Sequence, residues 1–360
     1  MPLNLVTGAT GFLGSHIVER LLEDNQPVRV IVRPGSNSGY LDRLPVDKVV
    51  ANLEDRSAVE KACKGVDAIY HAAAKVDAWG PWEGLHRQTV EVTRNLANAA
   101  HKLSVRRFLH ISSVSVYGSL PADEDAIPRA GKPDAVDFPA WNRYGMAKLQ
   151  AEKVLWHLHE TEGFPVTVIR PTSIYGPRDR ITVPSIYRML LSGQLRILGN
   201  GENRLGVVFV KDVANACVLA ARSDHAVGQA YNCTSDEPVT QRDFLTLWAN
   251  AFGRPAPSGT APYWLAFSIA SLYECAARLL RNRTIPSTNR YGIWIMGKRP
   301  CPSVEKASQQ LGWRSEITHR EGISQSARWY MENMHGQESD VDAFRSRRPE
   351  QPGQVPGPPR

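Results

Sequence analysis

Short apolar segments alternate with segments of helical spacing through the first half of the chain. The apolar segments are rich in β-branched residues, which is typical of strands. We expect strands at residues 3–6, 28–32, 48–53, 68–71, 107–112 and 166–170. Between the first two, Ile17, Leu21 and Leu22 recur at helical spacing. This alternation predicts an α/β fold with a doubly wound parallel sheet.

The chain changes character after Arg170. Proline and glycine become frequent in the predicted loops, with one more strand-like run at residues 229–233 and a helix-like run at 244–251. We expect a sheet domain of residues 1–170 with about 206–235, and a smaller C-terminal region of about 171–205 with 236–335. Residues 336–360 are dominated by Pro, Gly, Gln, Ser and charged residues, so this tail is predicted to be disordered.

Residues 261–273 carry no charge. The stretch is too short for a membrane span, which needs about 20 apolar residues. Leu265, Ile269, Leu272 and Leu279 follow helical spacing, which favours a helix packed on the core. The alternative is a lid that touches a membrane surface, which leaves peripheral membrane contact open.

Composition narrows the class of protein. With 360 residues and 42% apolar content, the chain can bury a full core. Its net charge is +7, but Lys and Arg are spread along the sequence, so we expect no nucleic-acid partner. The five cysteines are scattered without a Cys-x-x-Cys pair, which predicts reduced, buried thiols and no metal site. The first strand begins near residue 3 without a basic or apolar leader, which favours a cytoplasmic protein.

Three glycines join the first predicted strand to the following helix in the run Thr7-Gly8-Ala9-Thr10-Gly11-Phe12-Leu13-Gly14. Glycine is needed where the turn is tight, where the backbone approaches a pyrophosphate, and where the helix packs close to the strand. The first N–H groups of the helix then face the anion. The turn therefore predicts a dinucleotide-binding site.

The second predicted strand ends at Val32 and is followed by Arg33. An acidic residue usually holds the free ribose 2′-hydroxyl of NAD at this position, whereas an arginine can neutralise the 2′-phosphate of NADP. Arg33 therefore favours NADP, and NAD is the alternative.

Tyr144 and Lys148 lie one turn apart at the start of a segment of helical spacing. A free tyrosine titrates near ~10, too high for a base at neutral pH, but a nearby ammonium favours the phenolate. Tyr144 can then take a proton from an alcohol or donate one to a ketone. Ser113 follows the strand at 107–112, where its hydroxyl can orient the reacting oxygen. These residues predict hydride transfer to or from an alcohol or ketone carbon.

Together these motifs resemble the extended short-chain dehydrogenase/reductases, the epimerase/dehydratase superfamily with a Rossmann fold. The resemblance rests on Thr-Gly-x-x-Gly-x-x-Gly, on Ser113 and on Tyr-x-x-x-Lys, and it runs from about residue 3 to residue 329. It implies that Ser113, Tyr144 and Lys148 are catalytic, and that Lys148 also holds the nicotinamide ribose. The further cofactor contacts expected are Gly8, Gly11, Phe12, Leu13, Gly14, Arg33, Asn52, Leu53, Ala72, Ala73, Pro171 and Ser173.

Two positions depart from the family pattern. Asn52 precedes Leu53 where relatives usually have Asp-Leu near the adenine, and Thr89 stands where many have an asparagine. We therefore expect altered adenine binding, and we do not expect a four-residue proton relay.

The family includes nucleotide-sugar epimerases and dehydratases as well as reductases of apolar compounds. Nucleotide-sugar enzymes typically carry an asparagine in place of Ser173 and an arginine in place of Leu205. Dehydratases carry acidic residues after the catalytic hydroxyl, where this chain has Val114 and Ser115. The apolar segment near Trp264, the run at 78–82 and the ending at 306–313 resemble the 3β-hydroxysteroid dehydrogenase-like branch, which includes sterol dehydrogenases, dihydroflavonol reductase relatives and 2-alkyl-3-ketoacid reductases.

We expect a ketone reductase or alcohol dehydrogenase whose C-terminal region binds a small hydrophobic substrate. A nucleotide-sugar epimerase or dehydratase is the alternative. A catalytically silent NADP-binding scaffold is disfavoured because Ser113, Tyr144 and Lys148 are all present. Many relatives dimerise through helices beside the sheet, so a homodimer is expected.

Overall fold

The fold is known from a computed structural model. It describes residues 2–76, 79, 81–118, 120, 122–123, 136–280, 282, 286, 288–298 and 301–334. The tail expected to be disordered, residues 336–360, lies outside the described residues.

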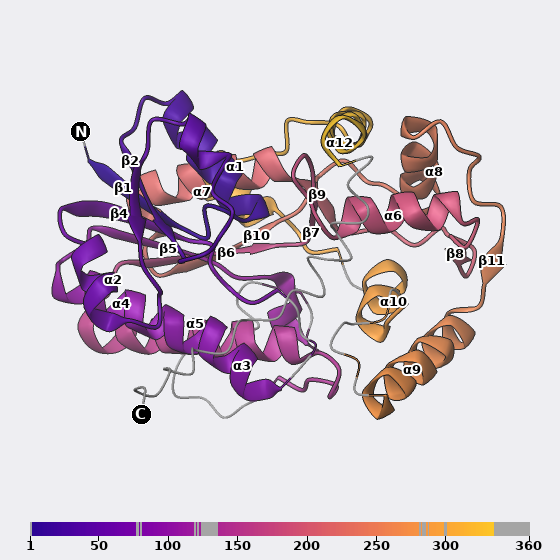
Figure 1. Cartoon of the computed structure of the whole chain (residues 1–360), viewed down its shortest axis with the longest axis horizontal. Helices are drawn as coiled ribbons and strands as arrows, with labels where there is room; N and C mark the ends of the chain where they lie inside the picture. The colour runs from indigo at the N-terminus through magenta and orange to yellow at the C-terminus, as the bar shows by residue number, and fades with distance from the viewer. Residues whose placement is uncertain are drawn as a thin grey trace, which may run out of the picture.

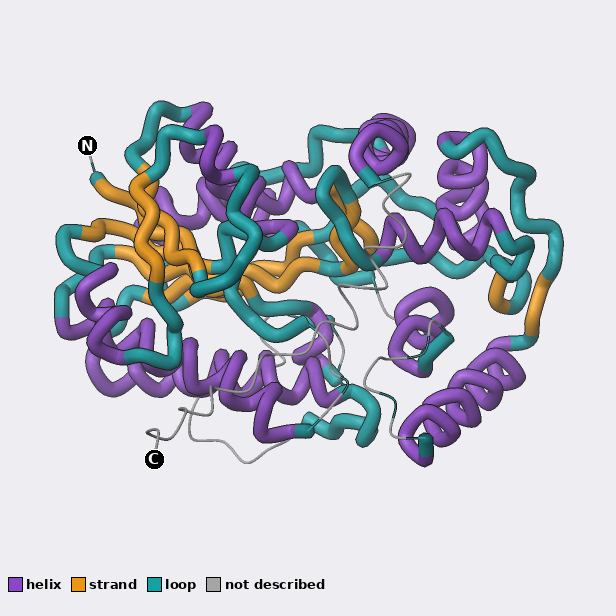
Figure 2. The backbone as a smooth tube through the Cα atoms, in the orientation of Figure 1, coloured by secondary structure: helices purple, strands orange, loops and turns teal. Residues whose placement is uncertain are grey.

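Seven parallel strands form the central sheet, in the order β10-β6-β5-β4-β1-β2-β3 (Figure 2). The strands are β1 (Leu3–Thr7), β2 (Val28–Val32), β3 (Asp47–Val50), β4 (Val66–His71), β5 (Arg107–Ile111), β6 (Val166–Pro171) and β10 (Gln229–Cys233). They confirm the expected α/β class and the doubly wound parallel sheet. The expected strand at 48–53 ends early, because Asn52 accepts the N–H of Glu54 on its side chain and starts a turn.

Helices cover both faces of the sheet (Figure 1). One face carries α1 (Phe12–Glu23) and α7 (Val210–Arg222), and the other carries α2 (Arg56–Ala62), α4 (Val92–Lys102) and α5 (Arg143–Glu162). Strands covered on both faces need apolar side chains on both, which explains their continuous apolar runs. The shorter elements are α3 (Trp82–His86), α11 (Glu305–Leu311), a π-helical turn at Arg87–Glu91, and helical turns at Leu41–Arg43, Val114–Tyr117 and Asp224–Ala226.

The strand order reverses between β1 and β4, so the crevice of this sheet opens beside the carboxyl ends of these two strands. The loop after β1 holds the three glycines, and the loop after β4 begins at Ala72. The fold therefore brings together the segments that the sequence assigned to a dinucleotide.

A second core lies in the C-terminal region, away from the sheet. It is built from the paired strands β7 (Ser173–Tyr175) and β9 (Val207–Phe209) and from α6 (Thr182–Leu191), α8 (Gln241–Ala251) and α12 (His319–Asn333). A smaller pair, β8 (Ile197–Leu198) and β11 (Thr260–Ala261), lies beside α8. The helix expected at 244–251 is α8, which begins at Gln241 because the Thr240 side chain accepts the N–H of Asp243.

The uncharged stretch forms α9 (Tyr263–Leu279), which packs against α10 (Arg290–Gly297) at one edge of the molecule (Figure 1). The helix was expected, but the prediction that its apolar face packs on the core is wrong. Only Ala270, Glu274 and Ala277 are buried, and most of the large apolar side chains of α9 face outward, whereas Phe267 is half-buried against Trp141. The helical spacing was correct, while the direction of the apolar face depends on packing that the spacing does not specify.

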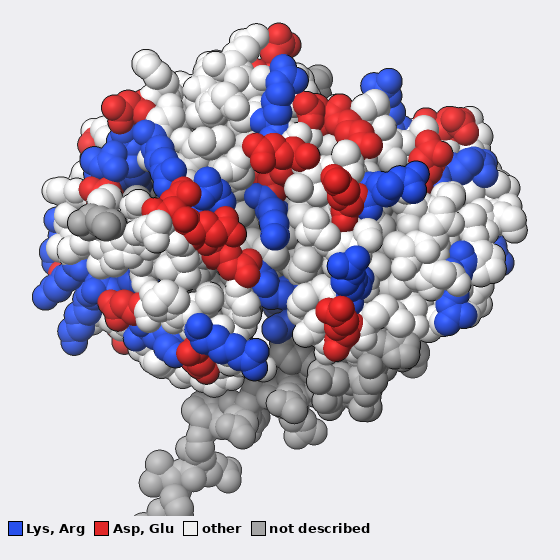
Figure 3. Space-filling model, turned by 90° about the horizontal axis from the view of Figure 1, so that it is seen from above, with Lys and Arg blue, Asp and Glu red and all other residues white. Residues whose placement is uncertain are grey.

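Charges of both signs are interspersed on the face seen in Figure 3, in keeping with their spread along the sequence. In the described part of the chain, no helix is both long and apolar enough to cross a membrane. Cys63, Cys217 and Cys233 are buried as expected, whereas Cys275 and Cys301 are exposed. The expectation fails at Cys275 because this residue lies on the outward face of α9.

Candidate active site

The glycine turn is held in a conformation that other residues cannot adopt. Gly8 has a φ of +71°, and a Cβ atom there would lie 2.8 Å from the backbone nitrogen of Ala73. A Cβ on Gly14 would lie 2.2 Å from the carbonyl oxygen of Gly8. The N–H of Gly11 donates to the same carbonyl at 2.9 Å. Glycine therefore lets β1, α1 and the loop after β4 meet in one place, with the first turn of α1 beside them.

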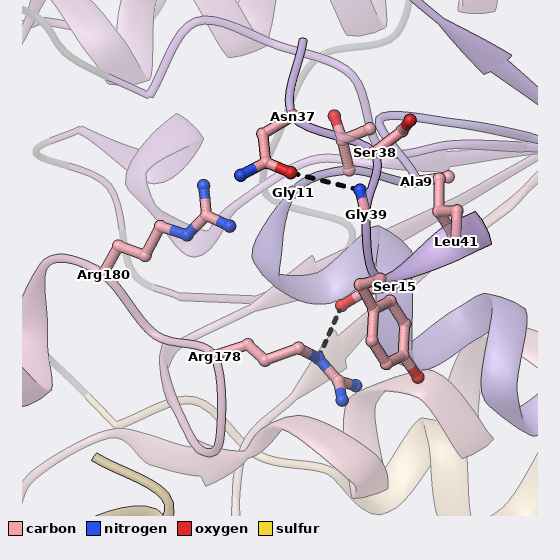
Figure 4. A pocket seen from close by; sticks show the side chains of 11 residues that line it. Ala9, Gly11, Ser15, Asn37, Ser38, Gly39, Leu41, Arg178 and Arg180 are labelled. Atoms are coloured by element: carbon pink, nitrogen blue, oxygen red, sulfur yellow. Dashed lines mark hydrogen bonds between the residues drawn. The ribbon is translucent and has the colours of Figure 1, made fainter. Parts of the chain in front are cut away.

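A cavity of about 240 Å³ lies in front of the glycine turn. Its walls come from the turn, from the loop after β2 and from the loop after β7 (Figure 4). The lining residues are Ala9, Thr10, Gly11, Ser15, Asn37, Ser38, Gly39, Tyr40, Leu41, Arg178 and Arg180. Two arginines and the N-terminal end of α1 line this cavity, which suits an anion such as a phosphate.

The two arginines differ in how their charge is used. Arg178 donates from Nε to the Ser15 hydroxyl at 3.0 Å, forms an ion pair with Glu19, and lies 4.4 Å from the ring centroid of Tyr40. Arg180 is exposed and makes no ion pair within the described residues. Arg180 is therefore the cation in this wall that is available to a ligand. The sequence analysis missed both, because more than 150 residues separate them from the glycine turn.

Three other predicted cofactor residues follow the ends of β2 and β3. Arg33 follows the end of β2, is exposed, and makes no side-chain hydrogen bond or ion pair in the described chain. Asn52 is also exposed, and the carbonyl oxygen of Leu53 accepts a hydrogen bond from Asn95 at 3.1 Å. These positions lie at the carboxyl ends of β2 and β3, so contact with the adenosine half of a dinucleotide stays a prediction.

The helix that carries Tyr144 and Lys148 is anchored to the end of β5. Lys148 is buried, and its Nζ donates to the carbonyl oxygen of Ile111 at 2.7 Å. Ile111 is the last residue of β5, and Ser113 follows two residues later. The structure thus brings Ser113, Tyr144 and Lys148 together as the sequence predicted, at the carboxyl edge of the sheet.

Gly145 allows α5 to approach this segment closely. A Cβ atom at Gly145 would lie 2.4 Å from the carbonyl oxygen of Ser115. The side-chain oxygen of Asn142 caps the helix by accepting the N–H of Gly145 at 3.1 Å. The first turn of α5, which includes Tyr144, is therefore placed against the hydroxyl-bearing segment by the absence of a side chain.

A second tyrosine, which the sequence analysis did not identify, enters the site from α10. The Ser113 hydroxyl donates to the Ser115 hydroxyl at 3.2 Å, and the latter lies 2.7 Å from the hydroxyl of Tyr291. The ring of Tyr291 meets the ring of Tyr144 edge to face, with centroids 6.2 Å apart. Tyr291 lies 147 residues after Tyr144, so no local sequence signal could have indicated this contact.

Burial controls the charges around Tyr144. It lowers the pKa of Lys148 to about 8, against the attraction of the Glu152 carboxylate, which raises it. Burial, together with the Lys148 charge, lowers the pKa of His71 to about 3. His71 is therefore neutral at pH 7, with its ring nitrogens 2.8 Å from the Thr7 hydroxyl and 2.9 Å from the Thr93 hydroxyl. Lys148 is the cation one helical turn from the Tyr144 oxygen, where it favours negative charge.

Pro171 and Ser173, expected near the nicotinamide, lie at the end of β6 and the start of β7. The Ser173 hydroxyl is buried and has no hydrogen-bond partner among the described residues. A buried hydroxyl without a partner is costly, which indicates a ligand or water at this position. Leu205, which stands where nucleotide-sugar enzymes typically carry an arginine, is buried in the second core. The arginine one position earlier, Arg204, is exposed.

The model of the NAD dependent epimerase/dehydratase family matches residues 4–234. The chain belongs to this family. The glycine turn, Ser113, Tyr144 and Lys148 all lie inside the matched region. Membership in this NAD-dependent family makes the chain an enzyme that acts on CH–OH and keto groups with a nicotinamide cofactor.

Two curated relatives belong to the branch that the sequence favoured. A 2-alkyl-3-oxoalkanoate reductase of Stenotrophomonas maltophilia is 28% identical over 89% of this chain and 96% of its own length. A decarboxylating sterol-4-alpha-carboxylate 3-dehydrogenase of Mus musculus is 27% identical over 89% of both chains. These matches confirm the resemblance to the 3β-hydroxysteroid dehydrogenase-like branch.

Solved structures show the same fold in epimerases. The UDP-glucuronic acid 4-epimerase of Bacillus cereus, in complex with UDP-glucuronic acid and NAD, superposes with a TM-score of 0.69. It is 21% identical and covers 92% of this family member and 99% of its own chain. This likeness confirms the Rossmann-type fold, and the reaction must be argued from the site.

Gly145→Ala should reduce turnover by about 10²-fold, because the added methyl group forces the first turn of α5 away from Ser115 and displaces Tyr144. The matched control is Gly84→Ala, where the new Cβ meets nothing closer than the Lys75 amine at 3.9 Å. Steady-state kinetics, with circular dichroism as a check of folding, measure both variants. Wild-type turnover in Gly145→Ala would show that the close approach is not required.

The Lys148 pKa of about 8 predicts a loss of activity at alkaline pH. Below this pKa the ammonium is present and activity is constant, whereas above it the cation is lost and kcat/KM falls about tenfold per pH unit. Lys148→Met should be poorly active, with no such decline between pH 7 and 10. A wild-type profile that stays level through pH 10 would contradict the role of this proton.

Proposed function

We propose that this protein is an NADP-dependent ketone reductase or alcohol dehydrogenase acting on a hydrophobic substrate. The observation that carries the proposal is the anchoring of α5: the buried Lys148 ammonium bonds to Ile111, two residues before Ser113, and Gly145 approaches Ser115 closely. The glycine turn and the unpartnered Ser173 hydroxyl support a dinucleotide in the adjoining crevice.

The side chains of the site have distinct roles in this reaction. When bound, the nicotinamide supplies or accepts a hydride at the substrate carbon. In reduction, the Tyr144 hydroxyl donates its proton to the carbonyl oxygen, and in oxidation it takes the proton back. The Lys148 ammonium stabilises the negative charge left on Tyr144 and binds the nicotinamide ribose. The Ser113 hydroxyl orients the reacting oxygen.

Apolar side chains support a hydrophobic substrate. Aromatic side chains of the C-terminal region and Trp141 form a chain of ring contacts that begins at Tyr144 and Tyr291. Between ring centroids, Trp294 lies 6.0 Å from Tyr291 and 5.7 Å from Trp141. The Trp141 ring in turn lies 6.0 Å from the Phe267 ring. An apolar ketone gains about 25 cal/mol for each Å² that it removes from water in such surroundings. We propose that the region of residues 171–205 and 236–335 binds the substrate here.

The nucleotide-sugar epimerase or dehydratase remains the alternative. It is disfavoured because a dehydratase needs an acid near the catalytic hydroxyl, and here the Ser115 hydroxyl bonds to Tyr291 instead. A diphosphate also needs charged partners, whereas Leu205 is buried in an apolar core. A silent scaffold is disfavoured by the complete set of Ser113, Tyr144 and Lys148. We retain the homodimer as a proposal, which analytical ultracentrifugation measures directly.

A substrate panel tests the reaction. With NADPH, a bulky hydrophobic ketone such as a 3-ketosteroid or a 2-alkyl-3-oxo acid should be reduced, and Tyr144→Phe should lose at least ~10²-fold of this rate while still binding cofactor. UDP and UDP-sugars should neither react nor inhibit. Epimerisation of a UDP-sugar without net change in cofactor, or micromolar inhibition by UDP, would establish the alternative. Full activity of Tyr144→Phe would remove Tyr144 from the mechanism.

Cofactor preference tests Arg33. We expect NADPH to bind more tightly than NADH, and Arg33→Ala to lose roughly tenfold or more in affinity for NADPH alone, because a charge-assisted contact to the 2′-phosphate is removed. Arg43→Ala, which removes another exposed arginine, is the control. Fluorescence titration measures both cofactors. Equal weakening of NADPH and NADH would show that Arg33 does not contact the phosphate.

A further inference from the structure

The outward face of α9 is the largest exposed apolar feature in the described part of the chain. The described residues include twelve exposed large apolar side chains, and seven of them lie on α9 or directly after it. They are Trp264, Leu265, Ile269, Leu272, Tyr273, Leu279 and Leu280. Large exposed apolar patches mark a binding surface more often than chance exposure does.

The face is continuous and ordered around the helix. At about 100° per residue, the exposed residues fill an arc of about 180° centred near Leu272. Trp264 and Tyr273 lie at the two edges of this arc, and Leu272 and Leu279, which are 68% and 89% exposed, lie near its middle. Aromatic side chains with a polar group flanking aliphatic ones are typical of a helix lying at a membrane–water interface.

An ordinary surface helix buries its large apolar residues and exposes its charged ones, and α9 does the reverse. It presents Ala270, Glu274 and Ala277 to the protein. The Glu274 carboxylate accepts hydrogen bonds from the backbone N–H and the guanidinium of Arg290, both at 2.7 Å. The one acidic group of α9 is therefore buried and neutralised, and the outward face carries no negative charge.

Two basic residues lie at the ends of this helix. In sequence, residues 261–300 contain six Lys and Arg and one acidic residue, a net charge of +5 in a chain of +7. Arg278 lies near the C-terminal end of α9 with its guanidinium 5.2 Å from the Trp79 ring, and Lys298 lies near the N-terminal end with its amine 4.8 Å from the Tyr263 ring. Both ends of the apolar face are thus flanked by cations.

This charge distribution selects the occupant. A second copy related by a two-fold axis would bring the end with Lys298 against the end with Arg278, or Arg278 against Arg278. Either pairing places like charges together at the rim of an apolar contact, which is unfavourable. An anionic phospholipid surface complements both the apolar face and its basic rim.

We propose that α9 is a membrane-docking helix that lies in the interface of a bilayer containing anionic phospholipids. Leu272 and Leu279 enter the acyl region, Trp264 and Tyr273 lie at the headgroup level, and Arg278 and Lys298 contact the headgroups. α9 packs on α10, whose Tyr291 reaches Ser115, so docking places the lipid surface one helix away from the site. If the substrate is hydrophobic, as the proposed function holds, it reaches the site from the lipid phase; docking itself does not depend on that function.

Vesicle flotation of the full chain tests the proposal. The protein should float with phosphatidylcholine vesicles that contain about one quarter phosphatidylserine, and weakly with phosphatidylcholine alone. Leu272→Ser with Leu279→Ser should reduce binding by about tenfold or more. Arg278→Gln and Lys298→Gln should each lose about fivefold, for the anionic vesicles only. The matched control is Leu191→Ser with Met331→Ser, two exposed apolar residues outside α9, which should bind as the wild type does.

Two further measurements separate docking from other causes. Brominated acyl chains should quench tryptophan fluorescence in the wild type, and much less in Trp264→Phe. The Leu272→Ser and Leu279→Ser double variant should keep wild-type NADPH turnover with a water-soluble ketone, which shows that it is folded. The proposal is overturned if the wild type does not float, or if the double variant floats equally well. It is also overturned if sedimentation shows a dimer that the double variant converts to a monomer, because a second copy then covers the face.

Discussion

The buried charges on the inner face of α5 hold the active site in place. The Lys148 ammonium, the Glu152 carboxylate and the Arg170 guanidinium are all buried where α5 meets the ends of β5 and β6. Leaving one such charge without a partner costs about 3–5 kcal/mol, so the helix is stable only where each charge is satisfied. Glu152 accepts Arg170 at 2.6 Å and the Ser112 hydroxyl, and Lys148 donates to Ile111. These contacts fix where α5, and with it Tyr144, lies against the sheet.

The same network connects the catalytic helix to the rest of the sheet. Arg170 also donates to the Tyr117 hydroxyl at 3.2 Å, which in turn donates to Asn232 on β10 at 2.7 Å. Tyr117, in the helical turn that follows Ser113, is thus held by side chains from β6 and β10. The segment from Ser113 to Tyr117 makes no strand hydrogen bonds. Buried polar contacts on both sides of it hold it in place instead.

The sequence predicted those parts of the site whose signal is local. The glycine turn, Ser113 and the Tyr144–Lys148 pair each belong to a short motif, and the parallel sheet brings the ends of β1, β4 and β5 to one edge. Arg180 and Tyr291 could not be found in this way, since long loops and helices of the C-terminal region deliver them to the site. Helical periodicity located α9 but not its orientation, because a period of 3.6 residues does not say whether its apolar face meets protein or another phase.

The orientation of α9 follows from what lies beneath it. A helix normally turns its largest apolar residues toward the core. Here the inward positions are occupied by two alanines, by the half-buried Phe267 and by Glu274, whose buried carboxylate is bonded to the guanidinium and N–H of Arg290. Turning the helix over would bury Leu272 and Leu279 but break this ion pair. The Glu274–Arg290 pair therefore fixes the outward direction of the apolar face, just as the Glu152–Arg170 pair fixes α5. In both helices a buried ion pair, rather than apolar burial alone, decides which side chains face the protein.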